Sequence, residues 1–143
     1  MLSTGAQRPI ALNKAKPLIA IVDDDESVCR AVRRLVRSLS MDGETFSSGQ
    51  QFLDLVDAMP SFRPDCLVLD VQRPGMNGLE VQNRLATSGN ALPVIFNTAH
   101  DEVGVREKAL AAGAVAFLRK PFDDNLFIKT LEAALKRCAS GGK

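Results

Sequence analysis

The stretch LIAIVDDD, residues 18–25, joins a short apolar run to three consecutive carboxylates. Three later apolar runs also end on a polar residue: Cys66–Leu69 on Asp70, Val94–Asn97 on Thr98, and Val115–Arg119 on Lys120. In open α/β folds, ligands bind outside the carboxyl ends of parallel strands. If these runs are parallel strands, their polar ends meet at one edge of a sheet and form a single site.

The composition is that of one globular domain. The chain has 143 residues, of which 45% are apolar and 24% are charged, enough for a single core. A net charge of +1 gives no general attraction to nucleic acid or to an anionic membrane. No stretch approaches the roughly 18 apolar residues of a membrane span. The sequence therefore predicts no direct nucleic-acid binding and no membrane insertion.

The cysteines and the first residues bear on the compartment. Cys29, Cys66 and Cys138 are odd in number and widely spaced, which suggests neither a disulfide framework nor a zinc site. Residues 1–16 lack the apolar core of a signal peptide. A cytoplasmic protein fits both observations. We expect a flexible extension over 1–16, one domain over 17–138 and a flexible tail over 139–143.

Helical patterns alternate with the apolar runs, as in βαβ units with a parallel sheet. Residues 43–46 predict a further, short strand, and apolar residues at helical spacing predict a helix after each strand. The predicted helices cover about 28–39, 50–58, 79–86, 102–111 and a segment after Asp123. Asp101 and Asp123 are expected to cap the last two of them, and Gly113 to end the fourth.

The clustered carboxylates predict a site for a hard cation. Carboxylates that share one edge repel one another, and a divalent cation offsets that repulsion. Mg²⁺ prefers oxygen ligands and commonly bridges a carboxylate to phosphate oxygens, so Asp24 and Asp70 could hold it beside a phosphoryl group. Lys120 and Thr98 would supply a cation and a hydroxyl donor for the phosphate oxygens. Asp70 could then act as the nucleophile and form an aspartyl phosphate.

Several short motifs occur in a fixed order along the chain: Asp23-Asp24, Asp70, Pro74-Gly75-Met76-Asn77-Gly78, Thr98, Ala112-Gly113-Ala114 and Lys120-Pro121. Each motif alone is weak evidence, but the ordered set is specific. Together they resemble the receiver domain of bacterial two-component response regulators, over about residues 17–137. The sequence of residues 71–78 is similar to that of receivers fused to helix-turn-helix transcription domains.

The resemblance implies a fold and a metal site. The fold would be α/β, a flavodoxin-like (βα)5 three-layer sandwich with a five-stranded parallel sheet of order 2-1-3-4-5. Mg²⁺, with Mn²⁺ as a substitute, would be held by Asp24, Asp70 and the main-chain carbonyl of Gln72, with Asp23 acting through water. The Lys120–Pro121 bond would be cis. Asp25, one residue beyond the matched acidic pair, would be a turn former or helix cap.

The resemblance also implies roles in phosphorylation. Asp70 would be the phospho-acceptor, with Lys120 and Thr98 assisting. Thr98 would move toward the phosphate and Phe117 would turn inward behind it, so that these two residues form the switch. Gln72 and His100 would border the site and tune the lifetime of the phosphoryl group, which makes His100 a rim residue and not a phospho-acceptor.

The function implied is signalling and not enzymatic turnover. A sensor histidine kinase or a histidine phosphotransfer protein would supply the phosphoryl group, and the target would be an output protein that the sequence does not name. Because the chain stops at Lys143, without room for a DNA-binding domain, we expect a stand-alone receiver. The sequence leaves homodimerisation open.

Two residues depart from the receiver pattern, and two other functions stay open. Asn97 stands where receivers usually carry an apolar residue, and Arg73 places a cation before Pro74. These departures keep open a pseudo-receiver, a binding module that is not phosphorylated. The spacing Asp23-x-Asp25-x-Ser27 also resembles the nucleophile motif of haloacid-dehalogenase-like phosphatases, although Asp70 would then have no role.

Overall fold

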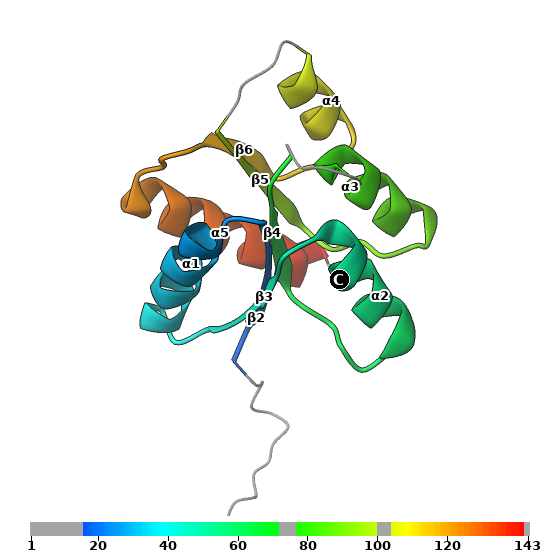
Figure 1. Cartoon of the computed structure of the whole chain (residues 1–143), viewed down its shortest axis with the longest axis horizontal. Helices are drawn as coiled ribbons and strands as arrows, with labels where there is room; N and C mark the ends of the chain where they lie inside the picture. The colour runs from blue at the N-terminus through cyan, green and yellow to red at the C-terminus, as the bar shows by residue number, and fades with distance from the viewer. Residues whose placement is uncertain (1–15, 72–76, 100–103, 142–143) are drawn as a thin grey trace, which may run out of the picture.

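Five parallel strands form one sheet in the computed structural model, which describes residues 16–71, 77–99 and 104–141 (Figure 1). The strands are β2 (Leu18–Val22), β3 (Asp42–Phe46), β4 (Cys66–Leu69), β5 (Val94–Thr98) and β6 (Ala116–Arg119). The sheet order is β3-β2-β4-β5-β6, with every neighbouring pair parallel. In chain order this is 2-1-3-4-5, which confirms the expected topology.

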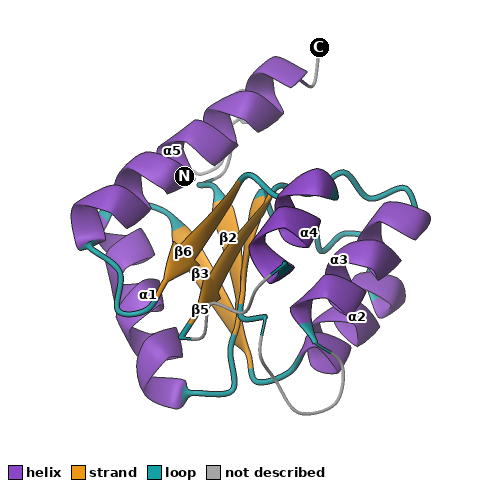
Figure 2. Ribbon diagram, turned by 90° about the horizontal axis from the view of Figure 1, so that it is seen from above, coloured by secondary structure: helices purple, strands orange, loops and turns teal. Residues whose placement is uncertain are grey.

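Helices cover both faces of the sheet. They are α1 (Glu26–Ser38), α2 (Gly49–Ala58), α3 (Gly78–Thr87), α4 (Val105–Ala111) and α5 (Asp124–Gly141). Figure 2 shows α1 and α5 on one side of the sheet and α2, α3 and α4 on the other. The result is the predicted three-layer sandwich. In the described part of the chain, no helix has the length and apolar character that a membrane span requires.

The alternation of side chains along each strand divides the core in two. In β5, Val94 and Phe96 belong to a buried cluster with residues of α2, α3 and α4. Ile95 belongs to the second cluster, with residues of α1 and α5. Because both faces are covered, the central strands are continuous apolar runs, as the sequence suggested.

The helix boundaries follow the predictions closely, with one correction. A continuous helix over 102–111 is wrong, because Gly104 has φ +86°, a left-handed conformation that a right-handed helix excludes, and α4 begins at Val105. Asp101, its predicted cap, lies outside the described residues. Asp123 Oδ2 does accept a hydrogen bond from the Leu126 amide, at 3.0 Å. The last helix, α5, continues to Gly141, inside the segment 139–143 expected to be a tail.

Asn97 is a polar exception within the apolar core. It precedes Thr98 at the end of β5 and is only 2% exposed. Among the residues that the structure describes, its side-chain oxygen Oδ1 is buried without a hydrogen-bond partner. A buried acceptor left unpaired costs roughly 1–3 kcal/mol by mutational data. The departure of Asn97 from the receiver pattern therefore carries an energetic cost in this structure.

Replacing Asn97 by leucine, which has the same number of side-chain heavy atoms, removes the unpaired acceptor. We expect Asn97→Leu to raise the free energy of unfolding by about 1–3 kcal/mol in the absence of divalent metal. Urea denaturation in the presence of a chelator measures the change. A lower free energy of unfolding would instead show that the amide oxygen makes a hydrogen bond that leucine removes.

Gly78 lets the start of α3 approach the chain that follows β4. A Cβ atom at this position would lie 2.8 Å from Phe96 Cε1, 2.9 Å from the Asp70 carbonyl oxygen and 3.0 Å from Val71 Cα. Two of these three atoms belong to the backbone at the end of β4. Only glycine fits here without moving that backbone.

We expect Gly78→Ala to lower the free energy of unfolding by about 1–3 kcal/mol, because overpacking displaces the backbone at Asp70. Gly43→Ala is the comparison, since its Cβ would meet side-chain atoms of Arg33 and Val36, each at 3.0 Å, which can shift. Urea denaturation of both variants tests the prediction. A smaller loss for Gly78→Ala than for Gly43→Ala would contradict it.

Candidate functional site

The sheet register places Asp23 and Asp70 side by side. The last registered pair between β2 and β4 is Val22 with Leu69, so the two aspartates follow at the same level. The Asp70 amide donates to the Val22 carbonyl at 3.1 Å, and the Asp23 amide donates to the Phe46 carbonyl at 3.1 Å. These bonds continue the strand ladders by one residue. They hold both backbones at the carboxyl edge of the sheet.

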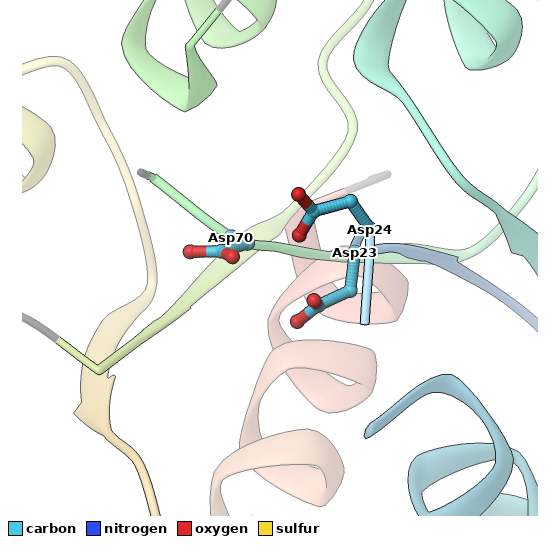
Figure 3. Close-up of side chains that lie close together, drawn as sticks. All are labelled: Asp23, Asp24 and Asp70. Atoms are coloured by element: carbon cyan, nitrogen blue, oxygen red, sulfur yellow. The ribbon is translucent and has the colours of Figure 1, made fainter. Parts of the chain in front are cut away.

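Three carboxylates converge at this edge. One oxygen from each of Asp23, Asp24 and Asp70 lies within 4.8 Å of the other two. Asp23 and Asp70 are buried, at 3% and 6% exposure, whereas Asp24 is exposed. Figure 3 shows the carboxylates of Asp23 and Asp24 on opposite sides of the ribbon, with Asp70 coming from the neighbouring strand. An all-oxygen donor set of this size fits a hard divalent cation such as Mg²⁺.

Lys120 supplies the positive charge of the site. Its Nζ donates to Asp23 Oδ2 at 2.8 Å and lies 3.4 Å from Asp70 Oδ2. Its amide donates to the Thr98 carbonyl at 2.8 Å, and the Lys120–Pro121 bond is cis, as expected. Burial alone would lower the pKa of Lys120, but the hydrogen bond to Asp23 and the charges of Asp70 and Asp23 raise it above its ordinary value. The ammonium therefore stays charged at neutral pH.

The two predicted switch residues, Thr98 and Phe117, are both buried. Thr98 is fully buried at the end of β5. Phe117 is 8% exposed, and its ring centroid lies 6.0 Å from that of Phe96. Because the Phe117 ring is already buried here, an inward rotation on phosphorylation would have to start from another side-chain position.

Asp25 lies outside the carboxylate cluster, as the sequence suggested. It is the N-cap of α1, and its Oδ1 accepts from the Ser27 hydroxyl at 2.6 Å and the Ser27 amide at 2.9 Å. The hydrogen bonds from the side chain and the backbone of Ser27 lower the pKa of Asp25 below its ordinary value. Its carboxylate is thus committed to the helix end.

Asp23 has a larger structural part than the sequence indicated. Lys120 was expected to assist Asp70, but its shorter bond is the one to Asp23. Asp23 Oδ1 also accepts from the Asp25 amide at 3.0 Å, and its carbonyl accepts from Cys29 Sγ at 3.3 Å. The only sequence signal for this role was its place next to Asp24. Gln72, Arg73 and His100, the other residues expected around the site, lie outside the described residues.

Comparison with known proteins agrees with this geometry. Residues 19–132 match the family model described as the response regulator receiver domain. The chain is 39% identical over 125 residues to the response regulator protein TmoT of Ectopseudomonas mendocina, covering 87% of this chain and 56% of TmoT. It is 41% identical over 119 residues to the response regulator protein TodT of Pseudomonas putida, covering 83% of this chain and 51% of TodT. The chain thus spans about half the length of these relatives.

Solved structures give the same family over nearly their whole length. A response regulator receiver protein from Burkholderia phymatum is 62% identical, with a TM-score of 0.77, covering 85% of this chain and 96% of that one. The structure described as FixJ-N is 30% identical, with a TM-score of 0.76, covering 86% of this chain and 96% of that one. The matched family model and the arrangement of carboxylates and lysine lead to one conclusion: this chain belongs to the response regulator receiver domain family.

Proposed function

We propose that this receiver accepts a phosphoryl group on Asp70 from a phosphohistidine, in the presence of Mg²⁺, and signals through a phosphorylation-dependent change of its surface. The observation that carries the proposal is the convergence of three carboxylates and Lys120 at one edge of the sheet. The donor would be a sensor histidine kinase or a histidine phosphotransfer protein. Such a partner implies action in the cytoplasm, as a signalling domain and not as a turnover enzyme.

The chemical step is an in-line transfer to a carboxylate. A carboxylate oxygen of Asp70 attacks phosphorus and forms a P–O bond, while the P–N bond of the donor breaks. The electron pair of that bond leaves with the imidazole nitrogen, which takes a proton from solvent. Lys120, held next to Asp70, would stabilise the negative charge that moves onto the phosphoryl oxygens during transfer.

The cation would be held by Asp24 and Asp70, with Asp23 acting through water. When bound, Mg²⁺ would neutralise the carboxylates and the phosphoryl oxygens, which otherwise repel one another. Asp23 is already engaged with Lys120, which suits a role at one remove from the metal. Asp24 is exposed and faces no described cation of its own, which suits direct ligation.

Thr98 and Lys120 would respond to the added charge by donating hydrogen bonds to it. A phosphoryl group adds about 1.5 to 2 negative charges and new acceptor oxygens. The Thr98 hydroxyl and the Lys120 ammonium are donors that could follow it, and Phe117 would repack behind Thr98. We place the resulting surface change on α4, β6 and α5, where an output protein would bind. Gln72 and His100 would set how long the phosphoryl group persists.

The haloacid-dehalogenase-like alternative is disfavoured by Asp25. In that mechanism, the carboxylates of Asp23 and Asp25 would both belong to the catalytic site, but Asp25 caps α1 instead. The pseudo-receiver alternative is disfavoured by the complete set of residues: Asp23, Asp24 and Asp70 converge within 4.8 Å of one another, and Lys120 pairs with Asp23 and Asp70.

Phosphorylation at Asp70 can be tested with a small acyl phosphate donor and Mg²⁺. We expect the wild type to gain one phosphoryl group and Asp70→Asn to gain none, because an amide is not a nucleophile of this kind. Intact mass, followed by mapping of the modified peptide, is the measurement. Asp25→Asn is the matched control and should be labelled like the wild type.

Labelling of Asp70→Asn would contradict the assignment of Asp70 as the phospho-acceptor. A wild type that no acyl phosphate or kinase labels would favour the pseudo-receiver. Repeated release of phosphate from many substrates would favour the phosphatase.

The neighbouring carboxylates Asp24 and Asp25 allow a second test. We expect Asp24→Asn to weaken Mg²⁺ binding about tenfold or more, because it removes a charged ligand, whereas Asp25→Asn should leave the affinity unchanged. Isothermal titration calorimetry suits a chain that has no tryptophan or tyrosine for fluorescence. Equal effects of the two substitutions would argue against the assigned ligand set.

A further inference from the structure

Asn97 lies in the same row of the sheet as the carboxylates. Val22 pairs with Leu69, and Leu69 pairs with Phe96, so the next row contains Asp23, Asp70 and Asn97. Asn97 itself pairs with Leu118 of β6. Since side chains alternate along strands, Asn97 shares the face of Ile95, which packs in the cluster of α1 and α5. The amide of Asn97, whose oxygen has no partner among the described residues, therefore lies beside Asp70, which follows the neighbouring strand β4.

The side chain of Lys120 reaches across the end of β5, the strand that carries this amide. Lys120 follows β6, and its Nζ bonds to Asp70 beyond β4 and to Asp23 beyond β2. The sheet order places β5 between β6 and β4, and neighbouring strands are about 4.8 Å apart. Lys120 also shares the alternation of Leu118, the lateral partner of Asn97. The lysine thus crosses the end of β5 on the face where Asn97 lies.

Lys120 has a hydrogen-bond donor to spare, and Asn97 has an acceptor without a donor among the described residues. An ammonium has three N–H donors, and Lys120 uses two of them on Asp23 and Asp70 among the described residues. Asn97 Oδ1 is an acceptor with no donor in that same part of the chain. An uncharged amide oxygen next to a carboxylate site is also a weaker magnesium ligand than the carboxylates around it.

We propose that Asn97 is a positioning residue for Lys120, whose ammonium donates to Asn97 Oδ1 once a divalent cation occupies the carboxylates. The inference rests on the cation site of the proposed function. A cation ligated by Asp70 would weaken the bond of this carboxylate to Lys120, and the amide would offer the ammonium a replacement. Lys120 then stays at β5, next to the acceptor Asp70, instead of turning out to solvent.

A double-mutant cycle between Asn97 and Lys120 isolates this contact. Mg²⁺ affinity is measured by calorimetry for the wild type, Asn97→Leu, Lys120→Met and the double variant. We expect Asn97→Leu to weaken Mg²⁺ binding about three- to tenfold when Lys120 is present, the equivalent of one hydrogen bond. In the Lys120→Met background, where binding is tighter overall, the same substitution should have no effect.

Ile95→Val is the matched control. Ile95 lies on the same strand and the same face of the sheet as Asn97, but two residues further from the site. It should leave Mg²⁺ affinity unchanged in both backgrounds, which separates a specific contact from a general effect on packing. Urea denaturation in a chelator provides a second measurement. There, the stabilisation by Asn97→Leu should be the same with Lys120 and with Met at position 120, because the contact forms only with the cation.

Equal weakening of Mg²⁺ binding in both backgrounds would overturn the proposal, since Asn97 would then act without Lys120. No weakening in either background, or no Mg²⁺ binding by the wild type, would also overturn it. The cycle needs no phosphoryl donor, so its outcome is separate from the labelling of Asp70. A wild type that shows the expected cycle but is never labelled would support the role of Asn97 and defeat phosphoryl acceptance.

Discussion

The bond between the Lys120 ammonium and the carboxylates of Asp23 and Asp70 is the interaction on which the site depends. Two nearly buried carboxylates beside an exposed third one repel each other strongly in a low-dielectric edge. Lys120 offsets that repulsion from β6, and in doing so ties the ends of three strands together. A cation held by these carboxylates, as proposed, would compete with Lys120 for their oxygens. Under the proposed function, the cation would take over part of the charge neutralisation that Lys120 provides in this structure.

The register of the strands brings the residues of this site together. Asp23, Asp70, Asn97 and Leu118 form one row because each parallel pair is in register with the next. A slip of one residue in any strand would turn its side chain to the opposite face and break the row. The apolar pattern of both cores prevents such a slip, since the residues of β4 and β5 before the row alternate between the two clusters. The geometry of the polar site is thus fixed by apolar packing beneath it.

The strands and the ends that carry chemistry could be predicted from the sequence, because continuous apolar runs and the polar residues after them are local signals. The cap formed by Asp25 was predictable for the same reason. The preference of Lys120 for Asp23 was not, since it depends on how two carboxylates compete for one ammonium in three dimensions. The start of α4 was missed because a left-handed Gly104 interrupts an otherwise helical pattern. Asn97 stood out in the sequence as a departure from the receiver pattern, but its burial and its place in the row beside Asp70 required the structure.

The way α4 is held suggests how a small change at Thr98 could reach the surface. Of the seven residues of α4 only Ala109 is buried, and its carbonyl accepts a hydrogen bond from Gln82 Nε2 of α3 at 3.1 Å. A helix with one buried side chain contributes little apolar packing, so alternative positions of α4 differ little in free energy. A phosphoryl group shifts such an equilibrium only by its differential interaction with the two states. Under the proposed function, charged hydrogen bonds from Thr98 and Lys120 to the phosphoryl group would supply this differential interaction, and the light anchoring of α4 would let it move the helix.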